Sequence, residues 1–164
     1  MKFIRNFDAV LNKIEAGILV TFLGVMVLLS FTQVILRNVF SSGFMWADIL
    51  LRHLVLWIGF LGAALATSAE RHISIDAFTR LLSARWKHLA RIVTNFFALV
   101  ICAFLAKASV TFVLSEMESQ TELFSGVMTW HAQMIIPVGY VLLMLHFIVR
   151  TIITLDEMVN VKPR

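Results

Sequence analysis

Four long apolar stretches constrain this chain more than any other feature of it. The first, residues 16–36, carries no charged side chain, and at about 1.5 Å per helical residue it matches a hydrocarbon core of roughly 30 Å. Similar stretches follow at about 46–69, 92–115 and 126–149. Hydrophobic residues make up 60% of the chain and charged residues 15%, which excludes an ordinary soluble domain. The sequence therefore predicts an all-α integral membrane protein, a single membrane domain over residues 1–164 with four transmembrane helices.

The basic residues predict the orientation of these helices. Of the 14 lysines and arginines, 11 lie in the N-terminal segment, in the loop between the second and third stretches, or in the C-terminal tail. Because such residues are retained on the cytoplasmic side during insertion, we expect both termini in the cytoplasm. We interpret the basic residues as topology signals and expect no nucleic-acid partner. The lone Cys102 offers neither a disulfide framework nor a cysteine-based metal site.

The loop between the third and fourth stretches has no basic residue and three acids, at Glu116, Glu118 and Glu122. On the predicted orientation this loop is periplasmic. Two interpretations stay open. It is either a solvated turn or a surface that contacts a basic patch on a soluble partner, with an affinity that falls as salt rises.

The loop between the second and third stretches predicts an amphipathic helix over about 76–89. On a helical wheel its large apolar residues gather on one face, and basic residues lie opposite. Such a helix lies at the membrane interface and contacts lipids. It is either a simple connector or a strut that braces a larger assembly. The residues that define it are Phe78, Leu82, Arg85, Trp86 and Leu89.

Polar residues inside a membrane are functional candidates because they are expensive to place there. Asp48 and Arg52 stand four residues apart, so they share a helix face, and we expect a structural ion pair or a docking contact. Lys107 lies toward the outer end of its stretch, where we expect it to reach water. None of the four stretches has a carboxylate near its midpoint, which argues against a chain that transports a solute alone.

Small residues of the second stretch recur at spacings of three and four and form a smooth stripe, with Trp57 close by. A neighbouring helix can approach such a stripe closely, either inside this chain or from a separate membrane subunit. In the fourth stretch, Pro137 predicts a kink. The stripe consists of Gly59, Gly62, Ala63 and Ala66.

The histidines leave one alternative function. His53 and His131 both lie toward the outer side and could ligate a haem, as in the membrane anchors of respiratory complexes. Their depths match poorly, so we expect no cofactor and no metal. We expect His146 at the cytoplasmic side, as an ordinary titrating surface residue.

The segment "WADILLRHLVLWIGFLGAALATSAERHISID", residues 46–76, resembles the small membrane subunit of the tripartite ATP-independent periplasmic (TRAP) transporters. An acid, an arginine four residues on, a tryptophan, "FLGAA" and a terminal "HISID" follow in the family's order. The four stretches, the cytoplasmic termini and the amphipathic connector are also similar to that family.

The resemblance implies a scaffold subunit, not an enzyme, in the cytoplasmic membrane of a bacterium. Its implied partners are a large multi-span subunit, which moves the solute in a sodium-coupled elevator motion, and a periplasmic solute-binding protein. The solute would be an organic acid such as a C4-dicarboxylate or a sialic acid.

Overall fold

The computed structural model describes residues 2–69, 84–124 and 126–160. Within these residues four helices are long and apolar enough to cross a membrane, which confirms the predicted fold class. The elements in chain order are α1 (Lys2–Phe40), α2 (Met45–Ser68), α4 (Ala84–Ser119), β1 (Glu122–Phe124), β2 (Val127–Met128), α5 (Thr129–Gln133) and α6 (Ile135–Asn160).

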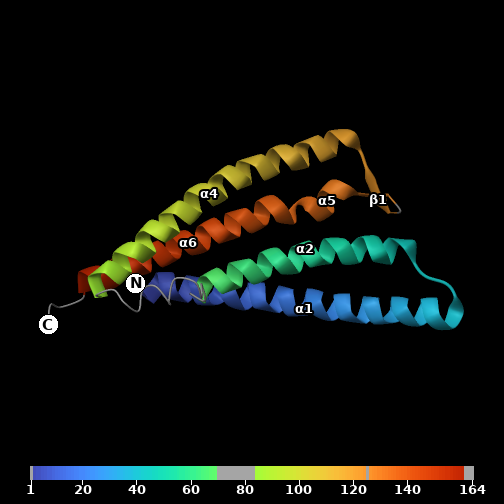
Figure 1. Ribbon diagram of the computed structural model, residues 1–164, viewed down its shortest axis with the longest axis horizontal. Helices are drawn as coiled ribbons and strands as arrows, with labels where there is room; N and C mark the ends of the chain where they lie inside the picture. The colour runs from blue at the N-terminus through green and yellow to red at the C-terminus, as the bar shows by residue number, and fades with distance from the viewer. Residues whose placement is uncertain (1, 70–83, 125, 161–164) are drawn as a thin grey trace.

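The four long helices lie side by side in the order α1, α2, α6, α4 (Figure 1). Along the chain they alternate in direction, α1 and α4 running one way and α2 and α6 the other, so the start of α1, the start of α4 and the end of α6 share one end of the molecule. The turn between α1 and α2 and the β1–β2 hairpin share the other end. The described ends of the chain therefore lie on one side, as the distribution of basic residues predicts.

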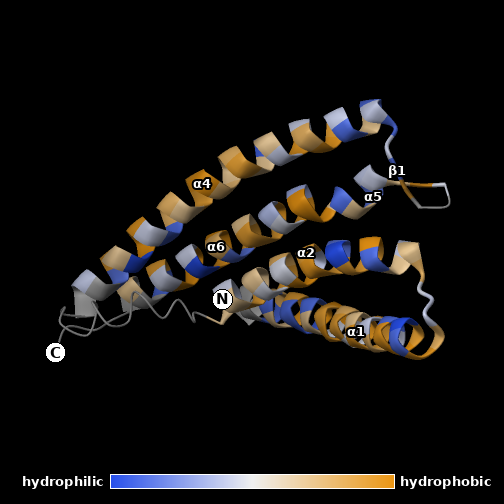
Figure 2. Ribbon diagram, turned by 45° about the vertical axis from the view of Figure 1, so that its right-hand side comes forward, coloured by the Kyte–Doolittle hydropathy of each residue, from blue (hydrophilic) through white to orange (hydrophobic). Residues whose placement is uncertain are grey.

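Most apolar side chains of this row face outward, and only a few are buried between helices. Hydrophilic residues gather toward the helix ends, and the middle of each helix is hydrophobic (Figure 2). In lipid the hydrophobic effect does not drive helices together, so close packing and polar contacts must hold the row.

The structure moves the start of the fourth span and interrupts the helix that follows. Residues 126–128, expected at the start of the fourth span, belong to a turn and to β2, because Gly126 takes a positive φ of 83°. The following helix is interrupted at Met134, three residues before Pro137, which confirms the predicted kink.

The end of the predicted amphipathic helix is continuous with the third span. Arg85, Trp86 and Leu89 belong to α4, because no glycine or proline between Ala84 and Arg91 would end a helix. Trp86 and Leu89 are exposed. Phe78, Leu82 and the rest of residues 70–83 lie outside the described residues.

Candidate functional site

The most buried polar group of the described chain lies at the cytoplasmic end, where α6 meets α1. The ring of His146 has no exposed surface and lies between two carboxylates of α1. Its Nδ1 is 3.3 Å from Oδ1 of Asp8, and its Nε2 is 3.1 Å from both carboxylate oxygens of Glu15. A ring flanked by two acceptors donates on both sides only when both nitrogens carry a proton.

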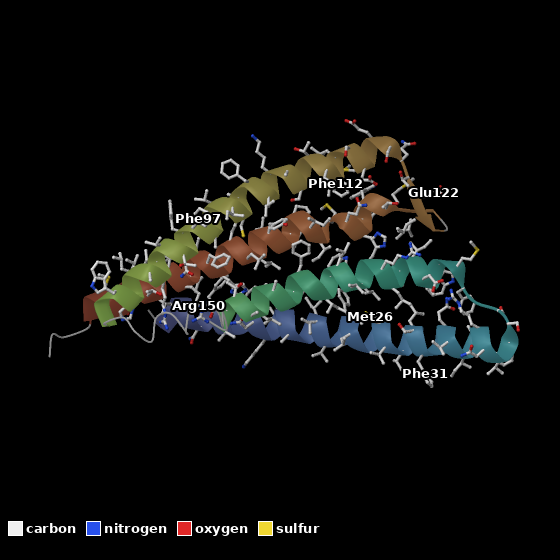
Figure 3. All side chains as sticks on the ribbon, viewed as in Figure 1. Met26, Phe31, Phe97, Phe112, Glu122 and Arg150 are labelled. Carbon is white, nitrogen blue, oxygen red and sulfur yellow. The ribbon has the colours of Figure 1, made fainter. Side chains whose placement is uncertain are left out.

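Two further residues bring α2 and the next turn of α6 into this group. Ser68 of α2 lies 3.4 Å from Oδ2 of Asp8, and its hydroxyl also accepts a hydrogen bond from Asn12. Arg150 lies one turn after His146; its guanidinium is 3.5 Å from Asp8 and donates to Ser68 (Figure 3). We call this group the His146 cluster; its members are Asp8, Asn12, Glu15, Ser68, His146 and Arg150.

The His146 cluster joins three helices and balances its own charge. With the imidazole doubly protonated, two carboxylates face two cations, which is the condition under which buried charges are tolerated. The expectation that His146 is a surface residue was wrong, because its ring is buried against two acids of α1. A signal was present in the sequence: Asp8, Asn12 and Glu15 recur at spacings of four and three and so share one face of α1.

A second polar contact closes the α1–α2 turn at the opposite end. Gln33 of α1 is buried, and its amide accepts a hydrogen bond from Phe44 N and donates to Phe44 O, so it caps the start of α2. Gln33 also donates to Oδ1 of Asp48, and Arg37 forms an ion pair with the other carboxylate oxygen. The ion pair predicted between Asp48 and Arg52 is thereby corrected, since α1 supplies the cation and Arg52 stays exposed.

The predicted small-residue stripe divides between two faces of α2. Gly62 faces α1, where an added Cβ would lie 3.7 Å from Leu19. Gly59, Ala63 and Ala66 are exposed and share their face with Arg52. A shallow groove of about 290 Å³ runs along this face, with Phe60 and Leu143 among its walls. We call this surface, with Arg52 at its periplasmic end, the α2 face.

The close approach inside the chain occurs elsewhere, between α2 and α6. A Cβ added to Gly139 would lie 2.4 Å from Cδ1 of Phe60, so only glycine fits there. The Phe60 ring also meets Tyr140 edge to face. Trp57 is internal as well: its Nε1 donates to the carbonyl of Ala132 at 3.0 Å, and its ring packs against Phe22.

The periplasmic end carries the predicted acidic residues. Glu118 and Glu122 are exposed and Glu116 is half-buried; Glu122 begins the hairpin that projects beyond α4 and α5 (Figure 3). His131 is exposed, and its ring stacks on Trp130.

Comparison with known proteins decides among the candidate functions. Residues 26–156 match the family "Tripartite ATP-independent periplasmic transporters, DctQ component". The chain belongs to this family. It is a small permease component of a TRAP transporter, not an enzyme, and a multi-pass protein of the bacterial inner membrane. The haem-anchor alternative is not favoured.

Three curated relatives are similar to the chain. A putative TRAP transporter small permease protein of Haemophilus influenzae is 28% identical over 64% of this chain and 65% of its own length. The C4-dicarboxylate TRAP transporter small permease proteins DctQ of Vibrio cholerae and Pseudomonas aeruginosa are 29% and 21% identical, over 50% and 82% of this chain. The matches span 35% of the Vibrio protein and 79% of the Pseudomonas protein.

Proposed function

We propose that this chain is the static scaffold of a sodium-coupled importer of an organic acid, working with a large membrane subunit and a periplasmic solute-binding protein. The family match over residues 26–156 carries the proposal. The contacts at both ends of α1 and α2 support it, because they fix the helices against one another. A scaffold needs such rigidity.

The large subunit docks on the α2 face. Ala63 and Ala66 are exposed there, and the groove beside them lets a second backbone approach closely. Arg52 adds a cation near the periplasmic boundary, which favours an acidic partner on the docked helix. Replacing Ala63 with leucine should therefore lower the yield of the complex, while the isolated chain keeps its thermal stability because Ala63 is exposed among the described residues. An unchanged yield of complex would mean that the α2 face contacts lipid.

The solute-binding protein contacts the periplasmic end through the acids at the end of α4 and the start of the hairpin. Changing Glu116, Glu118 and Glu122 together to glutamine should slow uptake when binding protein is scarce and have less effect when it is saturating. The defect should shrink at high salt, because surface charges are screened beyond about 10 Å at 0.1 M. Equal uptake at every binding-protein concentration contradicts this contact.

The solute is an organic acid, such as a C4-dicarboxylate or a sialic acid. Two of the relatives are named as C4-dicarboxylate proteins, and this supports the first choice. The chain itself contributes no midplane carboxylate for cation coupling, so both the solute site and the sodium sites belong to the large subunit.

Reconstitution in liposomes tests the whole proposal. With an inward sodium gradient, radiolabelled succinate or sialic acid should accumulate only when the large subunit, this chain and the binding protein are all present. This chain alone should accumulate neither solute. Full uptake by the other two components without it, or sodium-driven uptake by this chain alone, would overturn the scaffold function.

A further inference from the structure

Lys107 places a positive charge inside the apolar part of α4. It lies nine positions before Glu116, where the polar end of the helix begins, and at about 1.5 Å per residue this is roughly 13 Å. The side chain is exposed, and no acid of the described chain forms an ion pair with it. A charge at this depth is costly unless an anion reaches it.

Against the expectation from the sequence, the direction of α4 makes it hard for Lys107 to reach water. The Cα–Cβ bonds of a helix tilt toward its N-terminus. On the predicted orientation α2 begins at the periplasmic end, so Arg52 points toward the nearer water and can reach it. Because α4 begins at the cytoplasmic end, Lys107 is tilted away from the nearer, periplasmic boundary. Snorkelling therefore satisfies Arg52 far better than Lys107.

An apolar groove between α4 and α6 begins at Val110, about one helical turn after Lys107. The groove has a volume of about 540 Å³ and runs from Trp130 at the periplasmic end to Val141 of α6. Val110 and Leu114 line it from α4, three and seven residues after Lys107, so all three lie along one side of the helix. An occupant of the groove that continues one turn further along α4 would pass Lys107.

The positive charge of Lys107 and its depth in the membrane together indicate what occupies the α4–α6 groove. A phospholipid in the groove would keep its phosphate at the membrane surface and set hydrocarbon beside the lysine. A second copy of this chain cannot supply the anion, because none of its 10 acids lies near the middle of an apolar stretch. A transmembrane helix that carries an aspartate or glutamate at matching depth would fill the groove and neutralise the charge.

We propose that the α4–α6 groove receives a transmembrane helix of the large subunit, and that a carboxylate on this helix pairs with Lys107. The inference rests on the proposed function, since it takes the large subunit as the partner. It assigns a second contact to that subunit, separate from the α2 face.

Lys107→Met is the test, with Phe112→Met as the control on the same helix, five residues further along and outside the groove (Figure 3). In the isolated chain, Lys107→Met should keep or raise the thermal stability, because it removes an unpaired charge. In the complex it should lower the amount of large subunit that co-purifies by about tenfold or more, the usual loss when a buried charge loses its partner. Phe112→Met should leave both quantities unchanged.

Charge reversal identifies the partner acid. Lys107→Glu should also prevent assembly, and changing one acid of the large subunit to lysine should restore it. Cross-linking from Lys107→Cys in a Cys102→Ser background should reach the large subunit. Co-purification of Lys107→Met at the wild-type level overturns the pairing, as does a cross-link between two copies of this chain. Loss of bound anionic lipid with the large subunit retained overturns it too. If the wild-type chain does not co-purify with the large subunit, the proposed function fails as well.

Discussion

Replacing His146 with leucine tests whether the buried cluster at the cytoplasmic end holds the helices together. The ring bonds two carboxylates, and hydrogen bonds between membrane helices are worth about 0.6–1.7 kcal/mol each. The larger effect is on Glu15, which is 2% exposed and would keep a buried charge without the ring that faces it. Removing one partner of a buried pair typically costs about 3–5 kcal/mol, and we expect a loss of stability in that range.

A double variant separates charge pairing from packing. With His146→Leu and Glu15→Leu together, Asp8 and Arg150 remain as a balanced pair 3.5 Å apart. Replacing a buried ion pair by apolar groups is often neutral, so the double variant should recover most of the stability lost in the single one. His131→Leu is the control, because this histidine is exposed and its loss should change stability by less than about 0.5 kcal/mol.

The measurement is the free energy of unfolding of the isolated chain, obtained by titrating mixed micelles with a denaturing detergent and following tryptophan fluorescence. A cost below about 1 kcal/mol for His146→Leu would refute the reasoning, since it would mean that Glu15 finds another partner or water. A double variant as unstable as the sum of its single variants would refute the charge-pairing argument and leave only packing.

Two further predictions concern contacts between α2 and its neighbours. Gly139→Ala should cost about 1–3 kcal/mol, because its Cβ would overlap Phe60, whereas Gly59→Ala should be neutral in the isolated chain, with nothing within 4 Å of its Cβ. Equal stability of the two variants, measured by the same unfolding titration, would show that Phe60 moves aside freely. Asp48→Asn should lower stability by up to about 1 kcal/mol, since its ion pair with α1 is partly exposed, and Arg52→Gln should not. If Asp48→Asn and Arg52→Gln lowered the melting temperature equally, the Asp48–Arg52 pair would be supported instead.

The sequence by itself determined the fold class and predicted the orientation. Four long apolar stretches can satisfy their backbone groups in lipid only as helices, and the basic residues predict the side of each loop. These are local properties, and they need no knowledge of which helix lies beside which. Spacings of three and four also identified the face that carries Gly59, Ala63 and Ala66, although Gly62 of the same predicted stripe faces α1.

Tertiary structure alone decided which polar groups pair and which glycine packs. Asp48 pairs with Arg37, not with the nearer residue in sequence, because the α1–α2 turn brings α1 across the start of α2. The ring of His146 lies between two carboxylates of α1, a helix more than 130 residues earlier in the chain. Gly139 faces Phe60, while Gly59 faces outward. Helix spacing gives the face on which a residue lies, but the neighbour that covers that face depends on the order of helices in space, which no local pattern encodes.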